Sequence, residues 1–254
     1  MNAMFGTLTT DGLEEAEDRI GGGFQPFESD AYEAEIKAMY AGQSQGGAHS
    51  MTVIADIGGK EHRETIYFTN RKGENFFLNK DDKTKKVPLP GFTTVDHLCL
   101  VATGSPLSEC EFEDKVVQVY DYDAKREVPK TVPMLTAAIG SKVGLLLLKI
   151  LENKSKKEGD EYVDTTDTRE FNEIDKVFDI ESRMTVVEAQ NEVEEAIFVD
   201  SWIDRNKGQT RDKRTIKDGG DAGNSGRPGA AANKSAPAAG NGASKTKSLF
   251  GNKK

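Results

Sequence analysis

The sequence predicts a mainly β chain that folds as a small antiparallel barrel with short helices. Apolar and polar residues alternate with a period of two in three successive segments near the start of the chain. Short glycine-containing connections join these segments, and the stretches with helical character are brief. Consecutive strands with short connections pair antiparallel, so we expect a meander that opens a closed or partly open barrel.

The alternation predicts three strands, over residues 31–40, 51–57 and 60–69. In the first, Tyr40 is expected on the same face as Ile36. Gly58 and Gly59 indicate a tight hairpin turn between the second and the third. In the third, Arg63, Thr65 and Tyr67 are expected on the face opposite Ile66 and Phe68.

The later elements are shorter or less regular. Helices are predicted over 95–102, with Thr94 as a possible cap and Gly104 beyond its end, and over 134–139, ended by Gly140. Strands are predicted over 116–122, 143–151, 175–180, 185–189 and 196–199. The apolar run 143–151 also fits a helix, because periodicity alone does not separate the two in so short a stretch.

Composition divides the chain into three parts: a flexible arm over 1–27, a barrel domain over 28–216 and a disordered basic tail over 217–254. The tail is rich in Gly, Ala, Asn, Ser, Pro and Lys and lacks apolar periodicity, so it is not expected to fold. The formal net charge is −9, yet residues 204–254 carry +8. Local patches, not the total, therefore decide where a polyanion can bind.

The sequence favours a cytoplasmic protein without cofactor or metal. Cys99 and Cys110 give no disulfide framework and no metal-ligand spacing. No secretory signal opens the chain, and its most apolar run is nine residues long with Lys149 inside it, too short to cross a bilayer. We therefore expect no membrane association.

Catalytic motifs are poorly represented, and we expect no catalytic residues. The three histidines are scattered, and neither a phosphate-binding glycine motif nor a nucleophile elbow occurs. Glu109, Glu111, Glu113 and Asp114 with Lys115 resemble the carboxylates of a metal-dependent nuclease. An acidic loop before a strand is more often a solvated surface, so this alternative is remote.

A basic and aromatic cluster is the stronger candidate site. Residues 60–86 carry a net charge of +3 within a domain that is otherwise acidic. Unpaired nucleic acid needs this combination, because cations follow the phosphates while flat rings stack on the bases. The predicted DNA-binding residues are Arg63, Tyr67, Arg71, Lys72, Phe76, Phe77, Lys80, Lys83, Lys85 and Lys86.

A purely structural interpretation of the same cluster stays open. Phe68 is expected in the core, one of Phe76 and Phe77 could join it, and a lysine-rich loop is often only solvated. The end of the sequence is different, because two large apolar residues there stand among four lysines. We interpret it as a docking motif for a protein partner, carried by Lys247, Ser248, Leu249, Phe250, Lys253 and Lys254.

Several blocks of the sequence resemble the single-stranded DNA-binding proteins of a group of lytic short-tailed bacteriophages whose virions carry a giant RNA polymerase. The blocks are Gly22-Gly23-Phe24-Gln25-Pro26-Phe27, Ser29-Asp30-Ala31-Tyr32, Tyr40-Ala41-Gly42, Glu64-Thr65-Ile66-Tyr67-Phe68-Thr69-Asn70, Lys72-Gly73-Glu74-Asn75-Phe76-Phe77, Val87-Pro88-Leu89-Pro90-Gly91-Phe92 and Asn206-Lys207-Gly208-Gln209-Thr210-Arg211-Asp212. The resemblance extends over nearly the whole chain.

The resemblance implies an OB-fold-like barrel that binds single-stranded DNA in replication and recombination, in the cytoplasm of an infected bacterial cell. It also implies a role in late transcription, with phage or host replication, recombination or transcription proteins recruited by the tail. The lysines Lys253 and Lys254 depart from the acidic tails common in this functional class, so electrostatics favour an acidic docking surface. The alternative is a β-rich phage structural or protein-interaction protein that does not bind DNA.

Overall fold

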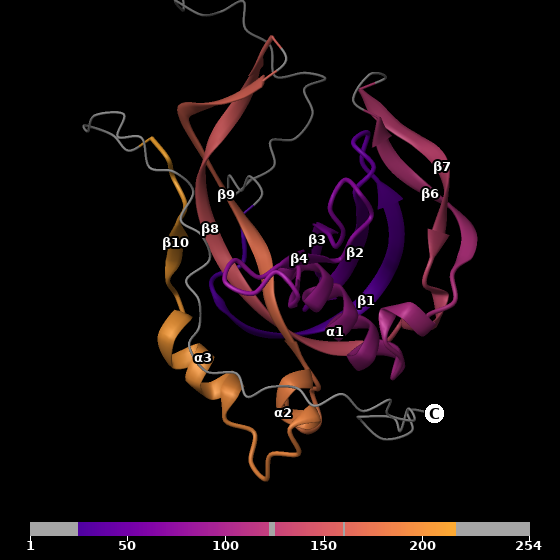
Figure 1. The fold of residues 1–254 in the computed structure, drawn as a ribbon, viewed down its shortest axis with the longest axis vertical. Helices are drawn as coiled ribbons and strands as arrows, with labels where there is room; N and C mark the ends of the chain where they lie inside the picture. Colours follow the sequence, from indigo (N-terminus) through magenta and orange to yellow (C-terminus); the bar gives the residue numbers. More distant parts are fainter. Residues whose placement is uncertain (1–24, 122–124, 160, 217–254) are drawn as a thin grey trace, which may run out of the picture.

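The computed structural model describes residues 25–121, 125–159 and 161–216, and within them the chain is mainly antiparallel β structure with a few short helices (Figure 1). The strands are β1 (Asp30–Gln43), β2 (His49–Ile57), β3 (Lys60–Tyr67), β4 (Phe76–Leu78), β5 (Lys86–Pro88), β6 (Glu113–Asp121), β7 (Arg126–Met134), β8 (Lys142–Glu158), β9 (Glu161–Phe178) and β10 (Thr210–Asp212). The helices are α1 (Pro90–Thr103), α2 (Val186–Gln190) and α3 (Phe198–Asn206), with single 3-10 turns η1 (Leu107–Glu109) and η2 (Thr136–Ala138).

The central sheet has the strand order of a Greek key. Strands β1, β2 and β3 form the predicted meander, and β8 returns after a long connection to pair with the other edge of β1. Strand β9 pairs with β8, which gives five antiparallel strands with a helix between the third and the fourth. The predicted mainly β, OB-fold-like architecture is confirmed, in the open form of that barrel.

The barrel stays open between β3 and β9, because no backbone ladder joins these strands in the described residues. Side chains bridge the seam instead. A carboxylate oxygen of Glu64 on β3 accepts a hydrogen bond from the backbone N–H of Ile174 on β9 at 2.7 Å. One buried donor of the unpaired strand edge is satisfied in this way.

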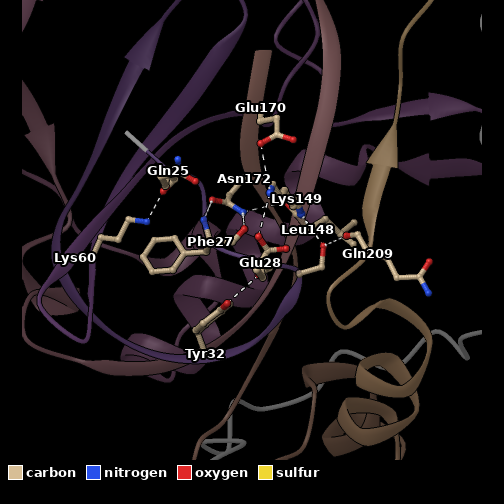
Figure 2. A network of polar contacts seen from close by, with 11 residues as sticks. Gln25, Phe27, Glu28, Tyr32, Lys60, Leu148, Lys149, Glu170, Asn172 and Gln209 are labelled. Atoms are coloured by element: carbon tan, nitrogen blue, oxygen red, sulfur yellow. Dashed lines mark hydrogen bonds and ion pairs between the residues drawn. The ribbon is translucent and has the colours of Figure 1, made fainter. Parts of the chain in front are cut away.

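Residues at the start of the described chain pack across the same opening between β3 and β9 (Figure 2). The Asn172 side chain on β9 accepts a hydrogen bond from the Phe27 N–H at 2.7 Å and donates one to the Phe27 carbonyl at 2.8 Å. The Phe27 ring also lies 4.3 Å from the ammonium group of Lys60 on β3. Of the predicted arm, Phe27 therefore packs on the barrel, and residues 1–24 lie outside the described part of the chain.

Helix α1 packs its buried residues, among them Val95, Leu98 and Val101, into the core formed by the barrel strands. Its first turn lies against the end of β3. A Cβ at Gly91 would overlap the carbonyl oxygen of Tyr67, so only glycine permits this close approach. The core packing of α1 thereby fixes the position of the last residue of β3.

Two long hairpins rise on opposite sides of β2 and β3 in Figure 1. One is β6–β7, which joins the sheet where Tyr40 pairs with Met134, and the other is the outer half of β8–β9. A small apolar cluster of Tyr40, Val132 and Met134 holds the β6–β7 hairpin against the outer face of β1. This hairpin therefore forms a wall beside the β1–β3 surface.

Two predicted strands are helical, and this part of the sequence analysis was wrong. Residues 185–189 coincide with α2, and the predicted strand 196–199 runs into the start of α3. The reason is local, because Thr185 and Glu188 form a reciprocal capping box that initiates α2. Helix α1 also begins earlier than predicted, at Pro90, and Thr94 does not cap it.

Candidate nucleic-acid interface

A groove of about 650 Å³ lies on the outer face of the meander, between β1–β3 and the β6–β7 hairpin. We call it the β1–β3 groove. Its lining residues come from three strands of the barrel, β1, β2 and β3, and from the two strands of the hairpin. They are Tyr40, Ala41, Gly42, Gln43, His49, Ser50, Thr52, Arg63, Thr65, Val119, Lys130, Thr131, Val132 and Pro133.

A β-bulge in β1 places Tyr40 in this groove. The register of β1 with β2 shifts between Ile36 and Ala38, so Ile36 and Met39 both point into the core. Tyr40 therefore lies on the outer face, and the prediction that it shares a face with Ile36 was wrong. Its hydroxyl accepts a hydrogen bond from the Arg63 guanidinium at 3.2 Å, which holds the cation at the groove.

The floor of the groove is polar and flat. Thr52 on β2 and Thr65 on β3 are directly opposite each other, and their hydroxyl oxygens lie 3.0 Å apart in a cross-strand hydrogen bond. Ser50 and Gly42 continue the floor toward the connection between β1 and β2. Small residues on this face leave space above the sheet, and the lining is completed by Arg63 and by residues of the β6–β7 hairpin.

The charge of the groove is opposite to that of the chain. Its lining contains the cations Arg63 and Lys130, and none of the lining residues is acidic. The chain as a whole carries −9. The groove is thus a local site where an anion is attracted although the average field of the protein repels it.

Two rings mark one end of the groove. The exposed His49 ring lines it and stacks on Phe68, with ring centroids 6.2 Å apart and an interplanar angle of 24°. Tyr67 is the register partner of Ser50 and 54% of its side chain is exposed. Both the His49 ring, packed on Phe68, and the exposed Tyr67 ring are suited to stack on an unpaired base.

The predicted cations Arg71 and Lys72 lie just beyond this end. The Arg71 side chain packs over Gly46 in the connection between β1 and β2. Backbone hydrogen bonds from Phe68 and Thr69 to the His49 carbonyl keep the two connections side by side. The structure therefore places Arg63 and Tyr67 on the same face of β3, and Arg71 beside the connection between β1 and β2.

The remaining predicted residues lie on a separate two-stranded sheet, β4–β5, and on its connection. Phe76 and Phe77 are neighbours on one strand, so their rings point to opposite faces of this hairpin. The Lys86 ammonium lies 4.2 Å from the centre of the Phe76 ring, and Phe77 is 47% exposed. The two rings therefore cannot stack on the same run of bases from one face.

The lysines of this connection are all exposed, namely Lys80, Lys83, Lys85 and Lys86. An Asp82 carboxylate oxygen lies 3.6 Å from the Lys85 ammonium nitrogen. The pKa of Asp82 is lowered chiefly by hydrogen bonds from the hydroxyl and the backbone N–H of Thr84, and further by the positive charge of Lys85. The β4–β5 hairpin, which follows β3 in the sequence, thus exposes both positive and negative side chains. None of its residues lines the β1–β3 groove.

Of the groove-lining residues, only Arg63 was among the predicted site residues, and the most informative of those missed are Tyr40, His49 and Lys130. Lys130 lies on β7, a strand that the sequence analysis did not predict. Pro129 and Pro133 lie within this strand, and the β6–β7 hairpin tolerates both. His49 was treated only as a scattered histidine. The sequence signal that could have identified it is its position at the end of a polar connection, directly before the alternating residues 51–57.

The structure says less about the predicted tail motif and the acidic segment before β6. The tail residues Lys247, Ser248, Leu249, Phe250, Lys253 and Lys254 lie outside the described residues. In the acidic segment before β6, Glu113 pairs with Lys115 at 2.8 Å. Among residues that the structure describes, no group of three or more His, Cys, Asp or Glu side chains is arranged to hold a metal ion. Within the same ranges, no helix combines the length and apolar character needed to cross a membrane.

The chain matches no protein-family model, and it matches none of the curated proteins with which it was compared.

Proposed function

We propose that this protein binds single-stranded DNA without sequence preference, in the β1–β3 groove. The observation that carries the proposal is the charge of that groove, which has two cations and no acidic lining residue in a chain of net charge −9. The strands that form its floor are the second and third of an OB-like barrel, the face on which such barrels bind oligonucleotides.

The chemistry of the lining supports unpaired over paired nucleic acid. Arg63 and Lys130 can follow phosphates on the two sides of the floor, while His49 and Tyr67 offer ring faces at one end. Bases are available for stacking only when they are unpaired. The lining offers hydroxyls and rings in place of a fixed set of base-reading pairs, which favours binding that tolerates any sequence.

The biological setting comes from the sequence resemblance. Single-stranded DNA-binding proteins of short-tailed phages act in replication and recombination, so we propose these processes for this chain, in the cytoplasm of an infected bacterium. By the same resemblance we propose a contribution to late transcription through a protein partner of the tail. We propose no enzymatic activity and no cofactor.

Fluorescence anisotropy with labelled oligonucleotides tests the proposal. We expect similar affinities for single strands of unrelated sequence, weaker binding of the matched duplex, and a logarithmic salt slope of about 0.7 per phosphate contacted. Arg63→Ala and Lys130→Ala should each weaken binding about fivefold or more, the equivalent of about 1 kcal/mol. Lys142→Ala, which removes an exposed lysine at the start of β8, serves as the matched control.

Equal affinity for duplex and single strand would refute the proposal. So would unchanged single-strand affinity in both groove variants. In that case the alternative of a β-rich interaction protein would account better for the fold.

A further inference from the structure

An exposed apolar patch lies far from the groove in the sequence, on the two short helices after β9. Three large apolar side chains are exposed there: Val187 by 50%, Ile197 by 62% and Phe198 by 37%. The Glu188 side chain joins the two helices, because it accepts hydrogen bonds from the backbone N–H groups of Ile197 and Phe198 at 2.9 and 2.8 Å and also from Thr185. Val187 directly precedes Glu188 in α2, so this carboxylate holds together the two backbone segments that carry the exposed side chains.

The segment that carries these apolar side chains is acidic. Residues 181–204 contain seven acidic residues and one cation, Arg183, which is already paired with Asp200 at 2.6 Å. Glu192, Glu194 and Glu195 are exposed in the connection between α2 and α3. We call the three apolar residues and these three glutamates the α2–α3 patch. Its charge excludes nucleic acid as the occupant, and a second α2–α3 patch would be repelled.

One segment of the same chain has the complementary composition. Residues 245–254 carry four lysines and no acidic residue, and they place Leu249 and Phe250 side by side between the charges. Two apolar side chains can cover the exposed valine, isoleucine and phenylalanine while the lysines meet the glutamates. Burial of apolar area and charge complementarity then act together.

The connecting chain is long enough for this contact. The 31 residues between Ile216 and Ser248 can span up to about 100 Å when fully extended, whereas a domain of this size has a radius of gyration of about 16 Å. Attachment to the same chain gives the segment an effective concentration of the order of millimolar, so even a weak contact is populated.

We propose that the segment Lys247–Lys254 docks on the α2–α3 patch of its own chain. Docking covers the exposed apolar side chains and withholds Leu249 and Phe250 from other proteins. A protein partner of the tail must then compete with the α2–α3 patch. The inference does not depend on DNA binding, and it is tested without DNA.

Site-specific photo-cross-linking in the full chain tests the docking. With p-benzoylphenylalanine in place of Phe250, we expect intramolecular cross-links to residues 187–200. Glu194→Lys with Glu195→Lys should lower their yield about fivefold or more, as should Lys253→Glu with Lys254→Glu, and combining the two pairs should restore it. Glu109→Lys with Glu111→Lys reverses two exposed charges elsewhere and should leave the yield unchanged.

Mixtures of isotopically light and heavy chains identify the acceptor. Cross-links between differently labelled chains would place the segment on a second copy and overturn the proposal, as would cross-links only to other surfaces. Amide NMR spectra of the full chain and of Leu249→Ser with Phe250→Ser give a second measurement. Shifts of residues 187–200 are expected, and identical spectra in that range would also overturn it.

Discussion

At the scale of single residues, the floor of the β1–β3 groove depends on small polar side chains. Thr65 is exposed on β3, and its hydroxyl bonds to Thr52 on the neighbouring strand. No lining residue of the groove is acidic, so a carboxylate introduced here would repel the phosphates of the DNA strand that we propose to bind there. The site is therefore sensitive to the sign of a charge at this position.

Substitutions at Thr65 give a matched pair of variants. We expect Thr65→Glu to weaken single-stranded DNA binding by about tenfold, because it places an anion in the groove that Arg63 and Lys130 also line. Thr65→Lys introduces a long side chain of the opposite charge and should preserve or strengthen binding. Anisotropy titrations at fixed salt compare the two, with circular dichroism to confirm the fold. Equal losses in both variants would show that side-chain bulk, and not charge, controls the site.

At the scale of elements, helix α1 sets the position of the end of β3. Gly91 in its first turn touches the backbone of Tyr67, and a side chain there would meet a carbonyl group that cannot rotate away. The gain in helix propensity from alanine is at most about 1 kcal/mol and should not compensate for this overlap. The close approach links core packing to the groove.

Gly91→Ala should therefore destabilise the protein by about 1–3 kcal/mol and weaken DNA binding by displacing Tyr67. Urea unfolding followed by Trp202 fluorescence measures the first effect and anisotropy the second. Gly46→Ala is the matched control for stability, since its Cβ would make ordinary contact with Arg71 at 3.4 Å. A Gly91→Ala protein as stable as the native chain would contradict the assigned packing.

The elements also show which parts of the fold the sequence predicts well. Alternation in residues 51–57 and 60–69 predicted β2 and β3 because each strand turns its apolar side chains to the core from one face and its more polar ones to the other. It failed in β1 after the bulge, where the register changes without a sequence signal that we recognised. The capping-box spacing of Thr185 and Glu188 is present in the sequence, but it was not considered when residues 185–189 were predicted as a strand.

The candidate site was predicted in part for the same reason. Arg63 and Tyr67 lie on a strand whose faces follow from alternation, so their common exposure could be predicted. Lys130 reaches the groove through tertiary packing of the β6–β7 hairpin, which local patterns do not encode. Phe76 and Phe77 were grouped by sequence proximity, whereas a strand separates the faces of neighbouring residues.

At the scale of the whole molecule, stability rests on the barrel core and on the helix that completes it. His97 on α1 is buried, and burial lowers its pKa below the ordinary value of 6.5. Asp96 opposes this shift and Lys176 adds to it. The folded state therefore holds His97 neutral in a pH range where the unfolded chain binds the proton.

The free energy of unfolding should consequently fall as the pH is lowered through 6.5, because the unfolded state then binds more protons than the folded state. His97→Gln should lose less stability than the native chain between pH 7.5 and pH 5.5. Urea titrations at several pH values measure this difference, and between pH 7.5 and 8.5 the two proteins should change in parallel. Identical pH dependence throughout would show that His97 is not the group responsible.

The central claim is that unpaired DNA lies in the β1–β3 groove. Photo-cross-linking of an oligonucleotide that carries 5-iodouracil, followed by mass spectrometry of the attached peptides, tests it most directly. We predict attachment at Tyr40, His49 or Tyr67, which border the groove, and loss of that attachment in Thr65→Glu. Attachment confined to Phe76 and Phe77 on the β4–β5 hairpin, or to any surface away from the groove, would contradict the claim.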